Sequence, residues 1–186
     1  MTSFSASTLA SLLWLAIATK AEGSLKIAEA EFINSRGEKT GTASLIETTR
    51  GVKISIQASN LPPGNHGIHF HETGTCTPPD FKSAGEHFSP DKKQHGLKHR
   101  HGPHAGDLPN LKVGANGTVM TEFTTSRVTL DKGKNSLLKS GSTAIIIHLK
   151  PDDQVTQPSG DSGDRIACGV ITSESRARSK LKKNTS

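Results

Sequence analysis

Aromatic residues are scarce in this chain of 186 residues, which contains no tyrosine, one tryptophan and six phenylalanines. Hydrophobic residues make up only 32% of the sequence, so the core is expected to be mainly aliphatic. There is no internal repeat and no long low-complexity tract. A chain of this length can form one domain with a sizeable core and short appendages.

The apolar segment near the N-terminus is too short to span a bilayer comfortably, since TLASLLWLAIAT covers only residues 8–19. Small residues follow it, which is typical of a secretory signal peptide before its cleavage site. The preceding MTSFSAS lacks lysine and arginine, so an uncleaved anchor and a buried helix are alternatives. We predict a signal peptide at residues 1–21 and a periplasmic or extracellular (secreted) protein.

Cysteine is also rare, with only Cys76 and Cys168 in the chain. Two cysteines agree with an oxidising compartment, whereas two buried free thiols are common in cytosolic proteins. The predicted export signal favours a disulfide between them. Such a bond would close a loop of about 93 residues, for which loop-closure entropy gives roughly 4–5 kcal/mol of stabilisation.

The net charge of +6 is concentrated at the C-terminus, because residues 173–186 hold five basic residues and one acidic residue. The body at residues 22–172 is nearly neutral and is the predicted domain. The tail has almost no apolar content and is predicted to be disordered. A solubilising role is favoured over weak binding to polyanions or anionic surfaces, because no aromatic residues interleave with its charges. No specific nucleic-acid binding is expected.

Period-two alternation of apolar and polar residues predicts an all-β protein. The predicted strands lie at residues 25–34, 40–49, 51–59, 117–125, 142–150 and 165–172. Asn116-Gly117 is a hairpin signal, and no segment is convincingly helical. With the histidine-rich segment, this makes seven or eight strands of an antiparallel sandwich or flattened barrel. Two long segments without strand pattern, 72–111 and 150–164, are interpreted as functional loops.

Histidines are dense in HGIHFHETGTC, at residues 66–76. On a strand, residues i and i+2 face the same side, so His69 and His71 project together and make half of a metal site. Ile68 and Phe70 project the opposite way, into the core. His66 shares their side and is predicted to be a buried, hydrogen-bonded structural residue.

Further candidate ligands follow downstream in GEHFSP and QHGLKHRHGPHAGDLPN, namely His87, His95, His99, His101, His104 and Asp107. Imidazoles with one carboxylate in a tetrahedron are typical of zinc, whereas imidazoles alone suit copper. His148 ends an apolar strand, where a fourth ligand is favoured over a satisfied core residue. Arg165 can either pair with Asp164 or face an anionic substrate at a metal.

Five motifs in order resemble those of copper–zinc superoxide dismutases of the exported bacterial type: HGIHFHETGTC, HFSP, HGPHAGDLPN, IIIHLKPDD and GDRIACGVI. The resemblance covers about residues 25–172. It implies an eight-stranded antiparallel Greek-key barrel with one copper and one zinc cation per subunit. It also implies that superoxide is converted to dioxygen and hydrogen peroxide by Cu(II)/Cu(I) cycling, as antioxidant defence outside the cytoplasm.

The resemblance also implies a role for particular residues. The copper ligands are His69, His71, His87 and His148, and the zinc ligands are His87, His95, His104 and Asp107. Asp152 orients a copper and a zinc histidine, Arg165 guides superoxide, and Cys76 and Cys168 form the intrasubunit disulfide. The catalytic residues are therefore Arg165 and the bridging His87.

Some features depart from the family pattern or leave alternatives open. Ser89 stands where asparagine is common, and His99 and His101 are additional histidines, interpreted as solvated because the ligand sets are already full. Family members are homodimers or monomers, and no decisive dimer surface is apparent. The alternatives to an enzyme are a copper-handling domain without activity and a surface protein whose tail binds polyanions.

Overall fold

The structure, a computed structural model, describes residues 25–174, whose regular elements are ten strands and one short 3-10 turn, η1 (Lys82–Ala84). The strands are β1 (Ile27–Asn34), β2 (Lys39–Thr48), β3 (Gly51–Ala58), β4 (Gly64–His66), β5 (Ile68–His71), β6 (Leu111–Val113), β7 (Val119–Thr125), β8 (Ala144–His148), β9 (Arg165–Val170) and β10 (Thr172–Ser173). Within these residues no helix is long and apolar enough to cross a membrane. The predicted signal peptide and all but the first two residues of the predicted tail lie outside the described residues.

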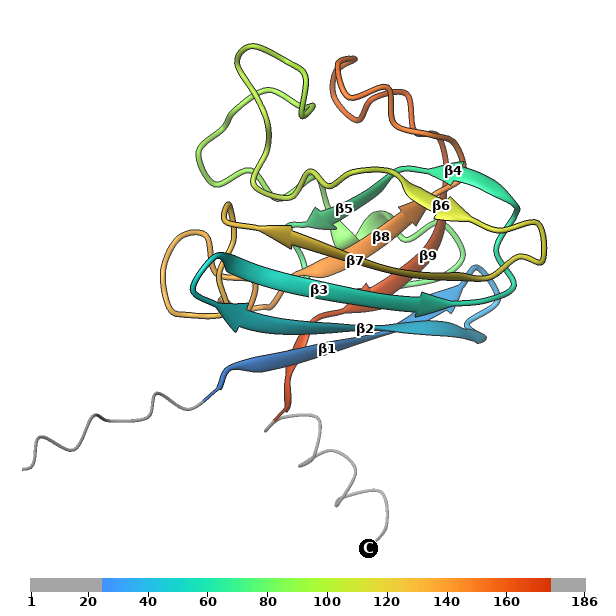
Figure 1. The fold of residues 1–186 in the computed structure, drawn as a ribbon, viewed down its shortest axis with the longest axis horizontal. Coiled ribbons are helices and arrows are strands. Elements are labelled where there is room, and N and C mark those ends of the chain that lie inside the picture. Colours follow the sequence, from blue (N-terminus) through green and yellow to red (C-terminus); the bar gives the residue numbers. More distant parts are fainter. Residues whose placement is uncertain (1–24, 175–186) are drawn as a thin grey trace, which may run out of the picture.

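Eight strands form one sheet in the order β5-β8-β9-β1-β2-β3-β7, with β10 added beside β1. Every pairing between strands is antiparallel, and the short β4 and β6 pair separately with each other. The sheet curls into a half-barrel, so that β1, β2, β3 and β7 form one layer and β5, β8 and β9 lie behind it (Figure 1). The prediction of an antiparallel all-β barrel is confirmed.

The core follows from the alternation in the strands. In β3 the buried residues Val52, Ile54 and Ile56 alternate with partly exposed polar neighbours. Each fully buried aliphatic side chain of this kind contributes roughly 1.5–3 kcal/mol. The main cluster is largely aliphatic, as the scarcity of aromatic residues predicts. The Asn116-Gly117 turn is also found, with Gly117 at a φ of 73° and its N–H donating to the Gly114 carbonyl at 2.9 Å.

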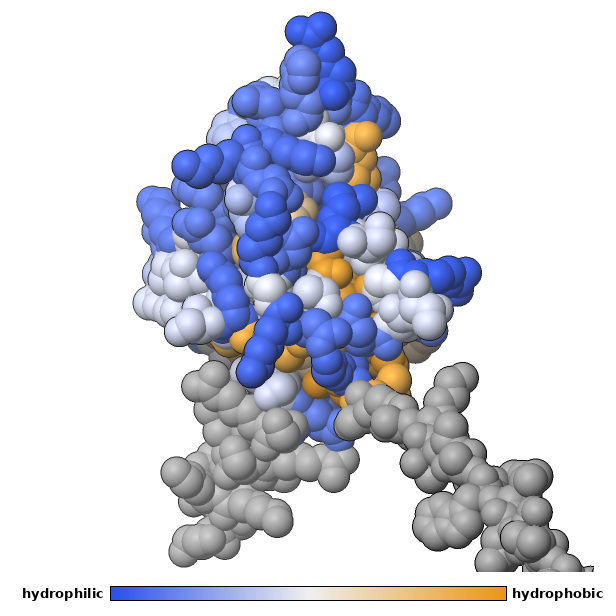
Figure 2. All heavy atoms as spheres, turned by 90° about the vertical axis from the view of Figure 1, so that its left-hand side faces the viewer, coloured by the Kyte–Doolittle hydropathy of each residue, from blue (hydrophilic) through white to orange (hydrophobic). Residues whose placement is uncertain are grey.

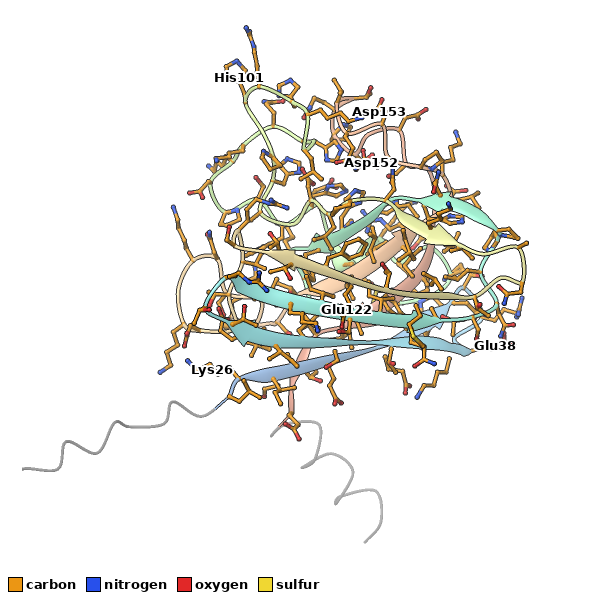
Figure 3. The ribbon with its side chains drawn as sticks, in the orientation of Figure 1. Lys26, Glu38, His101, Glu122, Asp152 and Asp153 are labelled. Carbon is orange, nitrogen blue, oxygen red and sulfur yellow. A yellow bond between two sulfur atoms is a disulfide. The ribbon has the colours of Figure 1, made fainter. Side chains whose placement is uncertain are left out.

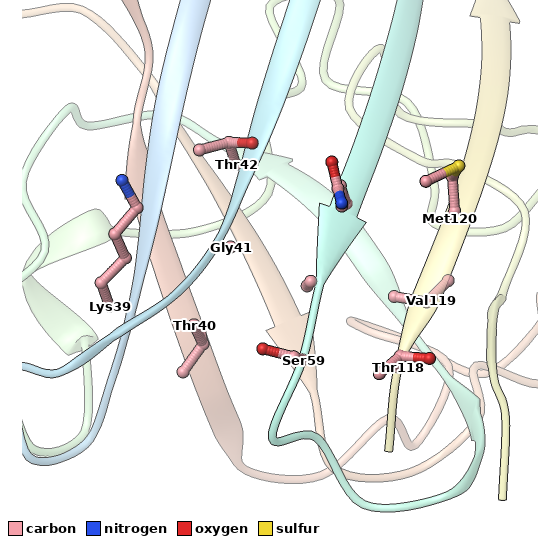
Figure 4. A pocket seen from close by; sticks show the side chains of 10 residues that line it. Lys39, Thr40, Gly41, Thr42, Ser59, Thr118, Val119 and Met120 are labelled. Atoms are coloured by element: carbon pink, nitrogen blue, oxygen red, sulfur yellow. The ribbon is translucent and has the colours of Figure 1, made fainter. Parts of the chain in front are cut away.

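The outer surface of the barrel carries a hollow that does not contain the predicted site residues. The face in Figure 2 is mainly hydrophilic, with only small separate apolar areas. A hollow over the ends of β2, β3 and β7 is lined by neutral side chains and one lysine, including Thr42, Ser59 and the exposed Met120 (Figure 4). None of the predicted metal or disulfide residues lines this hollow.

The functional loops predicted at 72–111 and 150–164 are found at 72–110, between β5 and β6, and at 149–164, between β8 and β9. They rise from the same side of the barrel (Figure 1). The first loop is fastened to β9 by a disulfide between Cys76 and Cys168, with Cα atoms 5.7 Å apart. Phe81 and Ala84 of this loop pack fully buried against Ile146 and Cys168. The loops therefore form a fixed cover over β5, β8 and β9.

Candidate metal centre

Strand β5 places the first pair of histidines as its period predicts. Ile68 and Phe70 belong to the barrel core, and His69 and His71 project to the other side. All four side chains have no measurable exposure, because the core covers one face of the strand and the loops cover the other. Burial of two imidazoles side by side is costly unless their nitrogens have partners.

His87 and His148 bring two more rings to this pair. His87 lies on the first loop and forms an isolated β-bridge with His71, whereas His148 ends β8 at a shift in register. Ligand atoms of His69, His71, His87 and His148 all lie within 4.8 Å of one another, and all four residues are buried. The structure thus assembles the set of residues that the resemblance assigns to copper.

The nitrogens of these four rings divide into two classes. On three rings the outer nitrogen has a partner: His69 Nε2 donates to Asp152 at 2.8 Å, His71 Nδ1 to the Gly85 carbonyl at 2.9 Å and His148 Nδ1 to the Gly163 carbonyl at 3.0 Å. The nitrogens left buried without a partner are His69 Nδ1, His71 Nε2, His87 Nε2 and His148 Nε2. Four unpartnered imidazole nitrogens that converge in this way fit copper.

A second set of ligands surrounds Asp107 on the other side of His87. Asp107 Oδ1 lies 3.2 Å from His87 Nδ1, 3.0 Å from His95 Nδ1 and 3.4 Å from His104 Nδ1. The Nδ1 atoms of His87 and His104 are 3.4 Å apart. A tetrahedron with Zn–N and Zn–O bonds of about 2.0–2.1 Å has edges of about 3.3 Å. These four residues therefore fit zinc, and His87 belongs to both sets.

Ligand atoms of Asp107, His69, His87 and His95 also lie within 4.8 Å of one another, so His69 is an alternative to His104 in this set. His69 Nε2 is already hydrogen-bonded to Asp152, whereas Nδ1 of the partly exposed His104 lies near Asp107. These contacts favour His69 in the copper-type set and His104 in the zinc-type set.

Asp152 connects the two sets. Its Oδ2 accepts from His69 Nε2 at 2.8 Å, and its Oδ1 accepts from His95 Nε2 at 3.0 Å (the carboxylate is labelled in Figure 3). This carboxylate fixes the tautomer and orientation of one ring in each set. Gly160 makes room for it, since a Cβ at this glycine would lie 1.7 Å from Asp152 Oδ1.

Arg165 lies beside the copper set and forms no ion pair with Asp164 within the described residues. Its Nη1 donates to the Phe81 carbonyl and its Nη2 to the Gly85 carbonyl, each at 2.8 Å. The Gly85 oxygen also accepts from His71 Nδ1, so one carbonyl joins the arginine to a copper-type histidine. The disulfide fastens the loop that supplies both carbonyls.

The protonation of the site follows from its burial. Desolvation holds the pKa values of His69, His71 and His87 below the usual range and lowers that of His148 to about 4. Burial also acts on His95, but hydrogen bonds to Asp107 and Asp152 outweigh it and raise its pKa to about 9. The copper-type rings are therefore neutral at pH 7, which is the form that binds a metal.

The metal-free protein is expected to lose stability as the pH falls from 6.5 to about 4, because His148 is protonated in this range. The unfolded chain takes up a proton on His148 near its ordinary pKa of 6.5, and the folded chain only near 4. Stability therefore falls as the pH drops between these values, by about 3 kcal/mol from His148 alone. His95, with its raised pKa, contributes a constant stabilisation below pH 6.5 and does not offset this loss. Melting temperatures of metal-free protein at pH 7 and pH 5 test this, and equal values would contradict it.

Three other histidines are placed as expected. His66 is buried, and its ring nitrogens lie 2.9 Å from the His148 carbonyl and 2.8 Å from the Pro62 carbonyl, so it is a structural residue. His101 is exposed at the tip of its loop (Figure 3). His99 is partly exposed. Neither belongs to a group of metal-binding donors among the described residues.

Some residues that shape the site carry no signal in the sequence. Arg127 Nη2 donates to the Asp107 carbonyl at 2.6 Å, and Gln157 binds the backbone of His95. Both side chains bind backbone groups that are 20 or 62 positions away in the sequence. Such contacts produce no recognisable sequence motif, because every residue has a backbone N–H or carbonyl. Gly160 is one of two glycines in its loop, and only the position of Asp152 shows why this residue must be small.

Four imidazoles converge on one side of His87, and a set of three histidines and one aspartate, which includes His87, lies on the other side. An antiparallel β-barrel with such a site fits the class of binuclear metalloproteins in which the two metals share a histidine. The family model described as Copper/zinc superoxide dismutase (SODC) matches residues 39–171. The chain belongs to this family of copper- and zinc-dependent enzymes.

Relatives and solved structures agree with this assignment. "Superoxide dismutase [Cu-Zn] 1" of Aquifex aeolicus (strain VF5) is 53% identical over 144 residues, covering 76% of this chain and 85% of the relative. "Superoxide dismutase-like protein YojM" of Bacillus subtilis (strain 168) is 43% identical over 144 residues, covering 76% and 74%. The crystal structure of a SOD-like protein from Bacillus subtilis superposes with a TM-score of 0.74 at 42% identity, covering 76% of this chain and 95% of that one.

Proposed function

We propose that this protein converts two superoxide ions and two protons into one dioxygen and one hydrogen peroxide. The observation that carries the proposal is the convergence of four unpartnered imidazole nitrogens beside the zinc-type set. Copper held by these nitrogens supplies one-electron exchange between Cu(II) and Cu(I), which the redox-inert zinc cannot provide. His87, His95, His104 and Asp107 would hold zinc, which would keep the surrounding loop in shape.

His87 is the residue proposed to handle a proton. Its Nε2 faces the copper set and its Nδ1 lies 3.2 Å from Asp107 Oδ1 in the zinc set. Burial lowers the pKa of His87, so the ring is neutral at pH 7 and its Nε2 would be free to bind copper or, when not bound to it, to hold a proton. Zinc bound to the opposite nitrogen, Nδ1, and to Asp107 would keep Nε2 directed at the copper-type set.

Arg165 is proposed to bind the anionic substrate. An arginine keeps its charge at every physiological pH, and its two carbonyl contacts fix the guanidinium next to His71. The hollow beside it is lined by both signs of charge, including Lys82, Glu86 and Asp164. The carboxylates there oppose the attraction that Arg165 exerts on superoxide.

Neutralising Glu86 is therefore expected to accelerate capture of superoxide. Glu86 interacts electrostatically with Arg165 and lies exposed in the same hollow. We expect Glu86→Gln to raise kcat/KM about twofold at low ionic strength, with the difference vanishing in high salt. Glu29→Gln, on β1, removes the same charge away from this hollow and should leave the rate unchanged. A lower rate for Glu86→Gln would contradict the expectation.

The proposed reaction is tested by elemental analysis of the purified protein together with a superoxide-consumption assay. One copper and one zinc per chain with rapid consumption are expected. Bound copper without any consumption of superoxide would instead support the alternative of a copper-handling protein.

We further propose that the protein is exported to the periplasm or secreted, which the Cys76–Cys168 disulfide supports. Fractionation of the native cells, with sequencing of the mature N-terminus, tests this, and an intact residue 1 in the cytoplasm would contradict it.

Homodimerisation and weak binding of the tail to anionic surfaces stay predictions. Deleting residues 175–186 should leave turnover in solution unchanged. The only effect expected from this deletion is weaker retention of the protein on an anionic surface. Analytical ultracentrifugation of the full chain tests the homodimer.

A further inference from the structure

The loop at 149–164 holds the backbone of one zinc-type ligand as well as its side chain. Gln157 Oε1 accepts from the His95 N–H at 2.8 Å, and Gln157 Nε2 donates to the His95 carbonyl at 2.9 Å. A single amide thus pairs with both backbone groups of this histidine, as a neighbouring strand would. Its Nε2 also donates to the Val155 carbonyl at 2.9 Å, which fixes the amide within its own loop.

Gln154 fastens the next residues of the zinc loop. Its side-chain oxygen accepts from the Leu97 N–H at 3.3 Å, and its carbonyl accepts from the Lys98 N–H at 3.2 Å. The side-chain nitrogen reaches the Leu108 carbonyl, directly after Asp107, at 3.4 Å. Gln154 is buried and has a φ of 67°, a left-handed conformation that is costly for a residue other than glycine.

The two loops approach closely where these contacts occur. A Cβ at Gly96 would lie only 2.1 Å from the Gln154 carbonyl oxygen. His95 belongs to no strand, unlike His69, His71 and His148, so no ladder of hydrogen bonds fixes its backbone. The partners of its backbone N–H and carbonyl come from the other loop.

We infer that Gln154 and Gln157 are positioning residues that hold His95, and with it the zinc ion, in place from the loop leading to Arg165. The inference rests on the zinc ligand set of the proposed function. Hydrogen-bond partners of ligating residues commonly change metal affinity 10–100-fold. Here the partners act on the ligand's backbone and on its loop, rather than on its ring.

The test uses the full-length, metal-loaded protein and its variants Gln154→Ala, Gln157→Ala and the double variant. Gln94→Ala is the matched control, because this exposed glutamine lies on the same loop as His95 and its side chain forms no hydrogen bond within the described residues. Release of zinc and of copper to an excess of chelator is measured separately. The visible spectrum of Co(II) at the zinc position reports the ligand geometry independently of activity.

We expect zinc release to become about tenfold faster in the double variant and a few-fold faster in each single variant, with a shifted Co(II) spectrum. Copper release and the control should change less than twofold. Zinc release and a Co(II) spectrum like those of the parent protein would overturn the inference, as would equal acceleration for both metals, which indicates general destabilisation. Failure of the parent protein itself to bind one zinc would instead overturn the proposed ligand set.

Discussion

Replacing His87 by alanine is expected to lower superoxide consumption at least about 100-fold and to reduce the retention of both metals. His87 is the only proposed ligand with a nitrogen in each set, Nε2 toward copper and Nδ1 3.2 Å from Asp107. Loss of a mere hydrogen-bond partner of a metal ligand already costs 10–100-fold in affinity or activity, so loss of a shared ligand should cost more. Elemental analysis and the consumption assay measure the two effects on the same sample.

A suitable comparison is His101→Ala, which removes an exposed imidazole from the same loop. This control should keep both metals and the parent rate. The disulfide and the melting temperature of the metal-free His87→Ala protein should stay close to those of the parent, because His87 lies outside the hydrophobic core. Full activity of His87→Ala would remove the shared histidine from the mechanism.

Period-two patterns explain how much of the fold could be predicted. The strands that carry buried aliphatic residues on alternate positions were located within a few residues, for example Gly51–Ala58 against the predicted 51–59. The three-residue strands β4 and β6 were not predicted, because a period cannot be recognised over so few positions. The same period correctly separated His69 and His71 from the structural His66.

The rest of the site could not be derived from periodicity. His87, His95, His104 and Asp107 lie in irregular backbone, where sequence spacing does not determine direction, and only the resemblance assigned them to two metals. Two explanations for Arg165 were open, and the contacts to Phe81 and Gly85 carbonyls now set aside the ion pair with Asp164. Those carbonyls are invisible in a sequence, since every residue has one.

The supporting contacts of the zinc ligands were missed for the same reason. Arg127 and Gln157 both bind main-chain groups, of Asp107 and His95 respectively. Such contacts depend on how two irregular loops approach each other. Strands carry three of the proposed copper ligands and give them predictable directions. Loops carry all four proposed zinc ligands, whose positions depend on tertiary contacts.

Reversing the charge of Arg165 is expected to produce the second large effect. In Arg165→Glu, kcat/KM for superoxide should fall about 10–100-fold at low ionic strength, because a cation beside the copper set becomes an anion facing an anionic substrate. The salt dependence should reverse: added salt screens an attraction in the parent protein and a repulsion in the variant. Measuring kcat/KM from low to physiological ionic strength in both proteins tests this.

The reversal of salt dependence separates steering from a loss of structure. Arg165 also donates to the carbonyls of Phe81 and Gly85, and the second of these accepts from His71, so the substitution can disturb the copper set. Such a disturbance would lower copper content and the rate at every ionic strength, without changing the sign of the salt effect. Lys132→Glu makes the same change of charge at an exposed position outside this hollow and should keep most of the rate. An unaltered rate for Arg165→Glu, with both metals bound, would remove Arg165 from substrate capture.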